Sequence, residues 1–208
     1  MNNQRLNILG VGVDSVRFDD AVGRIDQMVH EGGPHHVVTV NPEFIMRAKK
    51  DPEFRSILNG ADLATPDGFG IRLAAHYLSQ PSTWVPIVRE VQAFIQGVSV
   101  GLAALLDRGI FKEVPELVTG VDLVWALAKL AEERGYTVYF LDKRGGLASD
   151  TPKRAAERLK LVHPKLKIVG AETVRPDDAS VIRRVSSKKP DVLFVAFGFP
   201  EQDFFIAE

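Results

Sequence analysis

Asp67 is the residue of this sequence whose position most favours catalysis, because it lies in the short loop Pro66-Asp67-Gly68 after a candidate β-strand. We expect so short a loop to expose the carboxylate at the end of the strand. An exposed carboxylate can act as a general base that takes a proton from an attacking hydroxyl. It can also serve only as the acceptor of an Asx turn, and the sequence leaves both interpretations open.

Asn41 and Thr39 follow the preceding candidate strand, so we expect them at the same edge of the sheet as Asp67. Asn41 directly precedes Pro42, an arrangement typical of a residue that caps the start of a helix. The functional alternative is that Asn41 forms a hydrogen bond that orients Asp67. Asp67 and Asn41 are therefore the candidate catalytic residues, and Thr39 is a candidate for binding a substrate.

Five further residues are candidates for binding a substrate. The helix expected to begin at Thr119-Gly120 offers free backbone N–H groups and a positive dipole end, which suit a diphosphate, although these residues can equally form a cap and nothing more. Asp142 ends a strand and could accept hydrogen bonds from ribose hydroxyls, whereas simple solvation explains it equally well. Gly198 and Gln202 follow the last strand, where open α/β sheets bind ligands.

Short runs rich in β-branched residues alternate along the chain with helical patterns, which predicts an α/β fold. The expected strands cover residues 6–13, 36–40, 62–65, 137–141, 167–170 and 192–196. The expected helices lie near residues 18–31, 42–58, 68–79, 120–134, 152–162 and 177–188. Right-handed connections then give a mainly parallel, Rossmann-like sheet with helices on both faces and with the strand ends along one edge. We expect residues 1–208 to form a single domain.

Composition and missing motifs exclude several classes of protein. The chain carries 26 basic and 27 acidic side chains, a net charge of -1, which provides no overall electrostatic footprint for nucleic acid. It has no cysteine, which removes thiol catalysis, cysteine-ligated zinc, iron–sulfur clusters and disulfides. Ser15 stands where a dinucleotide fingerprint beginning at Gly10 needs its third glycine. No Asp-x-Asp pair occurs, and His35 and His36 face opposite ways as strand neighbours, so we predict no metal and no cofactor.

An uncharged stretch runs from Val91 to Leu106, and it is shorter than the roughly 20 apolar residues that a membrane-spanning helix needs. We therefore predict no transmembrane helix, although the apolar residues between positions 84 and 111 follow helical spacing. One interpretation is a helix that lies in a membrane interface. The other is an added helix packed on the core or on a second copy of the chain, favoured because its polar side lacks Lys and Arg.

Three blocks of the sequence resemble, in the same order, the signature blocks of one bacterial family. They are VVTVNPEFIMRAKKDPEFRSILNGADLATPDGFGI, VTGVDLVWALAKLAEERGYTVYFLDKRGG and PDVLFVAFGFPEQDFFI. Through them the chain is similar to the WecG/TagA/CpsF glycosyltransferases, which include N-acetylmannosaminyltransferases. The resemblance runs from Leu6 to the end, except for an inserted apolar helical segment over residues 81–116.

The resemblance implies a metal-independent, inverting transferase that uses a UDP-sugar donor. A hexosamine such as N-acetylmannosamine would pass to a polyprenyl-diphosphate-linked sugar in the synthesis of cell-surface polysaccharide or teichoic acid. The enzyme would be cytoplasmic and peripheral on the inner face of the cell membrane. Its expected partners are a lipid-linked acceptor and the membrane surface, with a second copy of itself as a further candidate and no nucleic acid.

The resemblance also implies roles for residues already singled out. Asp67 matches the proposed catalytic base of the family. Other matching positions lie beside that base, on the nucleotide-binding helix and in the last block: Thr39, Asn41, Thr119, Gly120 and Gln202. Family members continue past the last block with a C-terminal segment that adds a basic residue, and this segment is expected to be absent from a chain that ends at Glu208.

Two other functions remain open at the level of sequence. A non-catalytic module that binds a nucleotide sugar is compatible with the missing C-terminal segment. An α/β oxidoreductase is the second, and the absent glycine fingerprint argues against it. No spacing of residues discriminates among donor sugars or among acceptors.

Overall fold

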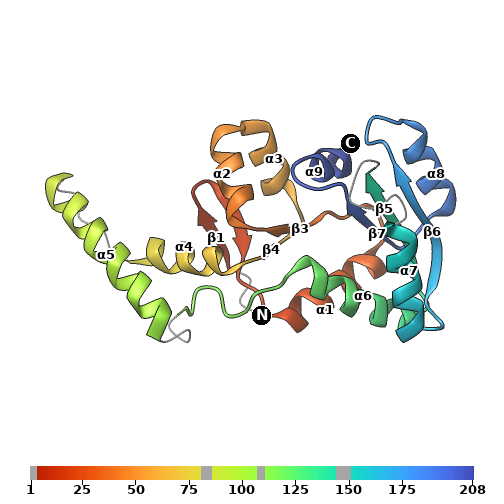
Figure 1. Ribbon diagram of the computed structural model, residues 1–208, viewed down its shortest axis with the longest axis horizontal. Helices are drawn as coiled ribbons and strands as arrows, with labels where there is room; N and C mark the ends of the chain where they lie inside the picture. Colours follow the sequence, from red (N-terminus) through yellow and green to blue (C-terminus); the bar gives the residue numbers. More distant parts are fainter. Residues whose placement is uncertain (1–3, 81–85, 107–110, 144–150) are drawn as a thin grey trace. The chain divides into compact units, whose positions relative to one another are not determined.

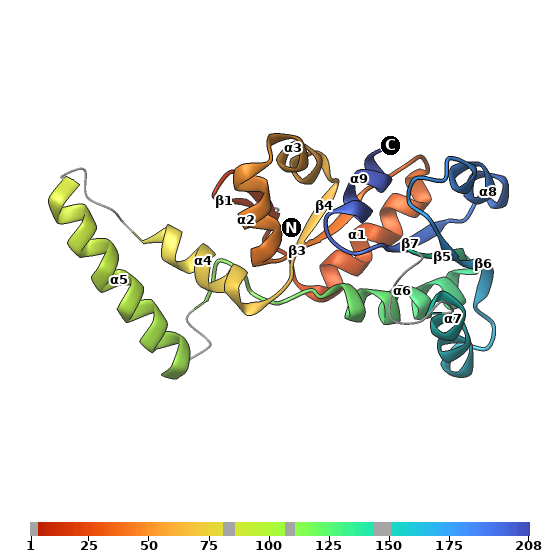
Figure 2. The ribbon, with the colours of Figure 1, turned by 45° about the horizontal axis from the view of Figure 1, so that its top comes forward.

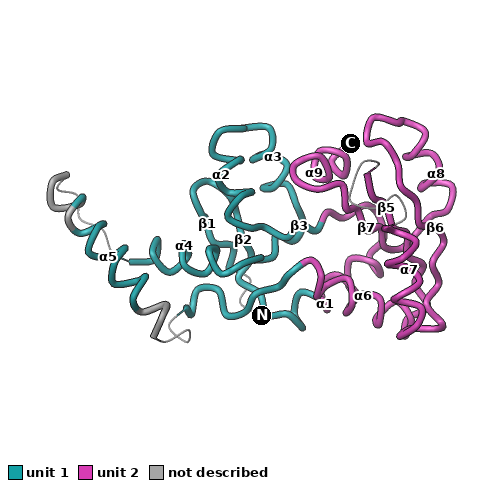
Figure 3. Tube along the Cα trace, viewed as in Figure 1, with its two compact units in different colours: residues 1–21, 37–119 teal, residues 22–36, 120–208 magenta. Residues whose placement is uncertain are grey.

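The computed structural model describes residues 4–80, 86–106, 111–143 and 151–208, and strands alternate in it with helices along the chain (Figure 1). The chain divides into two compact units (Figure 3). Unit 1 consists of residues 1–21 and 37–119, and unit 2 consists of residues 22–36 and 120–208. Helix α1 (Phe18–Glu31) has its first turn in unit 1 and the remainder in unit 2.

Unit 1 begins with an antiparallel hairpin of β1 (Arg5–Ile8) and β2 (Val11–Asp14). The single strand expected over residues 6–13 is therefore wrong. The chain reverses at Leu9 and Gly10, whose φ angles of 52° and 92° are both positive, as a tight two-residue hairpin turn requires.

The second pair of strands in unit 1 is parallel and joins β3 (Val37–Val40) to β4 (Leu63–Pro66). All four residues of β4 are buried, and Val38 and Val40 of β3 are buried with them. Because the two strands run in the same direction, the residues that follow each strand lie at one edge of the pair.

Two helices connect β3 to β4, namely α2 (Pro42–Lys50) and α3 (Pro52–Gly60). The single helix expected over residues 42–58 is wrong because Pro52 has no N–H to donate and its ring disfavours helical backbone at the residue before it. That residue, Asp51, ends α2, and its side chain accepts a hydrogen bond of 3.1 Å from a backbone N–H in the first turn of α3. The ring of Phe44 in α2 then packs edge to face against the ring of Phe54 in α3, with the two ring centroids 5.7 Å apart in the core of unit 1.

Helix α4 (Phe69–Ser79) begins directly after the loop that contains Asp67, and its first turn lies against the start of α2. A Cβ atom added to Gly70 would lie 2.6 Å from Cγ of Pro42, closer than packed carbon atoms approach. Gly70 therefore lets the start of α4 approach the start of α2 closely.

Helix α5 (Pro86–Leu106) packs on α4. In both views α4 lies between α5 and the strands of unit 1 (Figures 1 and 2). The helical spacing expected between residues 84 and 111 is confirmed over the range of α5.

Unit 2 contains a parallel three-stranded sheet with β5 at its centre and the strand order β6-β5-β7. Its strands are β5 (Thr137–Lys143), β6 (Lys167–Val174) and β7 (Val192–Ala196). Its helices, besides most of α1, are α6 (Gly120–Arg134), α7 (Thr151–Val162), α8 (Ser180–Lys188) and α9 (Glu201–Ala207).

Alternate residues of β5 enter two apolar clusters on opposite faces of this sheet. Val138 and Phe140 pack with buried residues of α6 and α7. Tyr139 and Leu141 pack with Val181 of α8 and with residues after β7. Helices therefore cover both faces of the sheet in unit 2, as expected.

The α/β class and the mainly parallel pairing of strands are confirmed. Within the described residues the strands belong to three sheets, β1-β2, β3-β4 and β6-β5-β7, and only the first is antiparallel. The interpretation of residues 1–208 as one domain stays a prediction.

We predict that Gly70→Ala destabilises the protein, although alanine normally stabilises a helix relative to glycine. The new methyl group would overlap the ring of Pro42, which cannot rotate away, so we expect a loss of about 1–3 kcal/mol in the free energy of unfolding. Gly60→Ala is the matched control, since a Cβ at Gly60 meets no atom within 4 Å. Urea unfolding of both variants measures the difference, and equal stabilities would contradict the close approach.

Candidate functional site

The predicted catalytic residues lie together where β3 and β4 end. The backbone N–H of Asp67 donates a hydrogen bond of 2.8 Å to the carbonyl of Val40, the residue before Asn41. Asp67 and Asn41 are both half-buried, and each follows the last residue of its strand. The structure thus confirms that the two residues share one edge of the β3-β4 pair.

A third segment of unit 1 runs alongside β4 and brings Thr119 to the same edge. The N–H of Val118 donates to the carbonyl of Pro66 at 2.9 Å, and the hydroxyl of Thr65 donates to the carbonyl of Val118 at 3.0 Å. The side chain of Thr65 is fully buried, so this second bond is shielded from water. Thr119 is therefore placed beside the residues that precede Asp67.

Thr39 lies two residues before Asn41 and pairs in register with Thr65. Residues two apart in a strand point to the same face, so Thr39 and Asn41 are on one side of the pair. The four predicted residues of unit 1, Thr39, Asn41, Asp67 and Thr119, are thus at or beside one strand edge.

Asn41 is the N-cap of α2, as its position before Pro42 predicts. Its Oδ1 accepts hydrogen bonds of 2.9 Å from the N–H of Glu43 and 3.1 Å from the N–H of Phe44. The cap uses the oxygen of the side-chain amide, and the NH₂ group is the part of Asn41 through which it can donate to a neighbour or a ligand.

The buried carboxylate of Asp14 fixes β4 from the other side. Asp14 ends β2, is 3% exposed, and accepts a hydrogen bond of 2.7 Å from the backbone N–H of Ala64. Acidic side chains are usually solvated, so the sequence alone does not predict the burial of Asp14. Its role here is to hold the strand that precedes Asp67.

The remaining predicted residues belong to unit 2. Asp142 lies next to last in β5, and its Oδ1 accepts a hydrogen bond of 2.8 Å from the N–H of Lys143. The ammonium group of Lys143 forms an ion pair with Glu201, the first residue of α9. Asp142 and Gln202 are therefore both close to this ion pair, at the carboxyl edge of the β6-β5-β7 sheet.

Gly198 and Gly120 occupy the two other predicted positions in unit 2. Gly198 has a φ angle of 80°, a conformation that favours glycine, and its carbonyl accepts from the N–H of Gln202 at 3.1 Å. Gly120 is the first residue of α6, where backbone N–H groups have no partner within the helix. Gly145 and Gly146, which follow β5 in the sequence, lie outside the described residues.

Asp203 is a buried acidic residue that sequence analysis missed. It is 1% exposed, and within the described residues its Oδ2 has no hydrogen-bond partner. Burial raises the pKa of the Asp203 carboxyl to about 7. The one sequence feature that points to Asp203 is its position directly after Gln202, in the first turn of a helix. This feature does not predict burial, because helix starts commonly carry exposed acidic residues.

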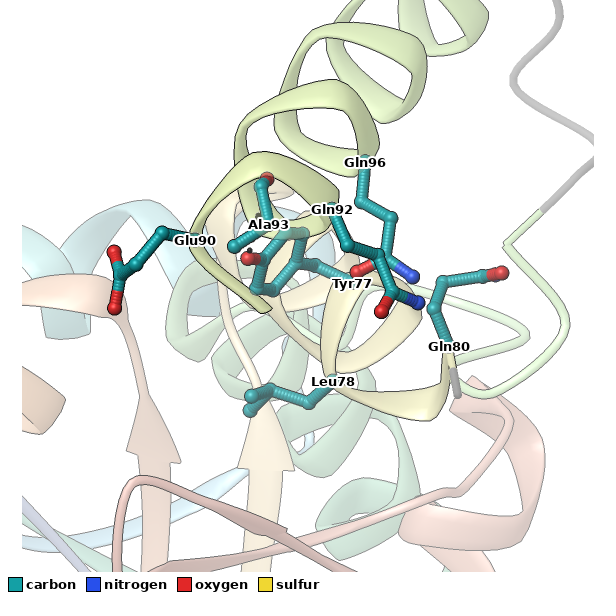
Figure 4. Close-up of a pocket in the computed structure, with 7 residues that line it drawn as sticks. All are labelled: Tyr77, Leu78, Gln80, Glu90, Gln92, Ala93 and Gln96. Carbon is teal, nitrogen blue, oxygen red and sulfur yellow. Dashed lines mark hydrogen bonds between the residues drawn. The ribbon is translucent and has the colours of Figure 1, made fainter. Parts of the chain in front are cut away.

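The two described pockets do not contain the predicted residues. One, of about 230 Å³, lies in unit 1 between the end of α4 and α5, where the side chains of Gln92 and Gln96 extend from α5 toward Gln80 at the end of α4 (Figure 4). The other, of about 300 Å³, lies in unit 2 between α6 and α7, beside Trp125 and Arg154. Among the residues that the structure describes, no group of three acidic or histidine side chains is arranged to hold a metal ion.

Gly97-Val98-Ser99-Val100-Gly101 matches the Gly-x-Ser-x-Gly pattern of a nucleophilic serine, but the structure argues against that chemistry. The pattern lies inside α5 rather than at a turn from strand to helix. The Ser99 hydroxyl donates to the carbonyl of Gln96 at 3.0 Å, a common helical contact.

We predict that Asp203→Asn changes how stability depends on pH. The folded protein holds the proton of Asp203 up to about pH 7, whereas the unfolded chain releases it near its usual pKa of 3.8. The wild type therefore loses stability as the pH rises between these two values, and the variant does not. Relative to wild type, we expect Asp203→Asn to be about 1–3 kcal/mol more stable at pH 8 and nearly equal at pH 4.

Denaturant unfolding across this pH range measures the effect. Asp177→Asn, at an exposed carboxylate of the same unit, is the control and should follow the wild-type profile. Parallel profiles for Asp203→Asn and wild type would show that burial does not shift the pKa of Asp203.

The chain is similar to a family model and to several curated relatives. The model described as glycosyl transferase WecG/TagA/CpsF family matches residues 6–96 and 92–208. The two matches meet within α5, the helix of the segment that sequence analysis identified as an insertion.

Two relatives carry the same name, N-acetylglucosaminyldiphosphoundecaprenol N-acetyl-beta-D-mannosaminyltransferase. The one from Bacillus spizizenii is 26% identical over 171 residues, which cover 82% of this chain and 52% of the relative. The one from Staphylococcus aureus is 24% identical over 208 residues, which cover 99% of this chain and 68% of the relative. The chain thus spans about half of the first relative and about two thirds of the second.

Because the family model matches almost the whole chain, the protein belongs to the WecG/TagA/CpsF glycosyl transferase family.

Proposed function

We propose that this protein is an inverting glycosyltransferase that moves a hexosamine resembling N-acetylmannosamine from a UDP-sugar to a polyprenyl-diphosphate-linked sugar. Family membership supports the reaction class. The names of the relatives support the two substrates, since those proteins are named for transfer of N-acetylmannosamine to an undecaprenol-linked diphosphate sugar. The reaction would contribute to the synthesis of cell-surface polysaccharide or teichoic acid.

The observation that carries the proposal is the position of Asp67. The bond from its N–H to Val40 fixes the backbone, and the half-buried side chain follows directly after a fully buried strand. A backbone fixed in this way sets the position from which the Asp67 side chain extends before a substrate binds, which favours general-base catalysis.

In the proposed reaction Asp67 removes the proton of the acceptor hydroxyl as the oxygen of that hydroxyl attacks the anomeric carbon of the donor. The bond from the anomeric carbon to the UDP oxygen breaks, and the configuration at that carbon inverts. Asn41 donates through its NH₂ group and orients Asp67 or the acceptor, and Thr39 and Thr119 bind substrate beside them. We continue to predict that the reaction needs no metal ion.

The residues of unit 2 are proposed to bind the nucleotide part of the donor. The N-terminus of α6 at Gly120 would stabilise the negative charge that develops on the diphosphate as it departs. Asp142 would accept hydrogen bonds from ribose hydroxyls. Gly198 and Gln202 would contact the donor or the acceptor.

We further propose that the protein works at the inner face of the cell membrane, where a polyprenyl-linked acceptor is held. None of the helices in the described part of the chain is both long enough and apolar enough to cross a membrane. We propose that the association with the membrane is peripheral.

We predict that Asp67→Asn lowers the rate of sugar transfer about 10²–10⁴-fold, the usual contribution of a general base. The amide keeps the size of the side chain but cannot accept the proton. Donor affinity, measured by calorimetry with a UDP-sugar, should change less than threefold. Asp62→Asn, at the other end of β4, is the control and should transfer sugar at the wild-type rate. A wild-type rate in Asp67→Asn would remove Asp67 as the base.

Asn41 has two roles in this account, and Asn41→Ser separates them. Serine keeps an acceptor for the cap of α2 but lacks the NH₂ donor, so we expect stability within about 0.5 kcal/mol of wild type and a clearly lower rate of transfer. Asn41→Ala should lose about 1 kcal/mol of stability as well. Thermal unfolding and transfer assays on both variants test this. If Asn41→Ser transfers sugar as fast as wild type, Asn41 is a cap and nothing more.

A further inference from the structure

Helix α5 presents an apolar face that the described residues of unit 1 leave exposed. Phe94 is 74% exposed, and Ile95, Val98 and Leu102 are each about half exposed or more. These four residues fall within one half of the helix circumference, given 100° of rotation per residue. We call Phe94, Ile95, Val98 and Leu102 the outer face of α5.

The opposite side of α5 is its inner face, which contacts α4. Val100 is 6% exposed, and the Tyr77 hydroxyl of α4 donates to the carbonyl of Ala93 at 3.4 Å. Gln92 and Gln96 line the pocket between the two helices (Figure 4).

The sequence argues against a membrane contact because the polar side of this helix lacks Lys and Arg. The packing of α5 on α4 removes that objection. An isolated interfacial helix needs a charged side that faces water. In α5 that side is packed against α4, so the helix needs no Lys or Arg there. The absence of charge between Val91 and Leu106 is then compatible with a helix held by protein on one side and by an apolar phase on the other.

We propose that the outer face of α5 docks on the hydrocarbon boundary of a lipid bilayer, with the helix lying in the membrane interface. The choice of a lipid surface rests on the proposed function, because a polyprenyl-linked acceptor is held in a membrane. An exposed apolar patch of this kind marks an interaction surface in a folded protein.

The size of the outer face also favours lipid over a second copy of the chain. A stable interface between two proteins buries about 800 Å² on each partner, whereas the four side chains that the structure describes on this face present on the order of 400 Å². A bilayer accepts a small apolar face without requiring a matching surface. The outer face carries no charge, so its binding does not depend on anionic lipid or on salt.

The test is flotation of the full chain with vesicles of phosphatidylcholine, without donor or acceptor. We expect the wild type to bind, with less than twofold change between 0.05 and 0.5 M salt. Phe94→Ser/Val98→Ser/Leu102→Ser should reduce the bound fraction at least tenfold. Leu161→Ser/Val162→Ser removes two exposed apolar side chains of α7 and is the control that should bind as wild type. Failure of the wild type to float, or equal binding by the outer-face variant, would overturn the proposal.

Two further variants keep the test independent of folding and of self-association. Phe94→Trp should be quenched by brominated phosphatidylcholine more strongly than wild type, and equal quenching would overturn the proposal. Gly97→Ala/Gly101→Ala adds methyl groups at one border of the outer face, where Cβ atoms meet nothing within 4 Å. It should bind vesicles as wild type does, whereas a contact between two copies through this Gly-x-x-x-Gly pair would weaken.

Sedimentation of the same proteins without lipid completes the design. A dimer that both the outer-face and the glycine variants abolish would assign the face to a second copy and overturn the proposal. Vesicle binding and sugar transfer to a water-soluble acceptor are separate readouts. An outer-face variant that no longer floats but still transfers sugar supports the proposal, and a wild type that floats without transferring sugar contradicts only the proposed function.

Discussion

The hydrogen bond from the N–H of Asp67 to the carbonyl of Val40 is the interaction on which the polar edge of unit 1 depends. Pro66 ends β4, and Asp67 continues the parallel β3-β4 pairing one residue beyond it. That one bond places the first residue after β4 beside the last residue of β3. The carboxylate of Asp67 and the amide of Asn41 consequently start from adjacent backbone positions.

Three further contacts hold β4 and the Asp67 loop in place. Asp14 holds β4 through the N–H of Ala64, and the buried hydroxyl of Thr65 holds the segment that leads to Thr119. Gly70 lets α4 leave the Asp67 loop in contact with Pro42. Each is a contact between residues far apart in sequence, so the edge forms only when β2, β4 and the segment before α6 have all folded.

The sequence predicts those structural features whose physical cause lies in neighbouring residues. Asn41 before Pro42 predicts a cap and forms one, and the alternation of strands and helices predicts the α/β class. The expected single strand over residues 6–13 failed because Leu9, a residue that seldom adopts positive φ, turns the chain there. The buried Asp203 and the link from Thr65 to Val118 depend on tertiary packing, which no spacing of residues records. Likewise, only the structure shows that the uncharged inner side of α5 is packed on α4.

The central claim is that Asp67 accepts the proton of the acceptor hydroxyl, and the most direct test is a distance. A structure of the protein with a UDP-sugar and an unreacted acceptor analogue would give the separation between the Asp67 carboxylate and the attacking hydroxyl. We predict a carboxylate oxygen at about 2.6–3.2 Å from that oxygen, or joined to it by one water. An attacking hydroxyl that instead contacts a different base, with Asp67 remote from both substrates, would contradict the account.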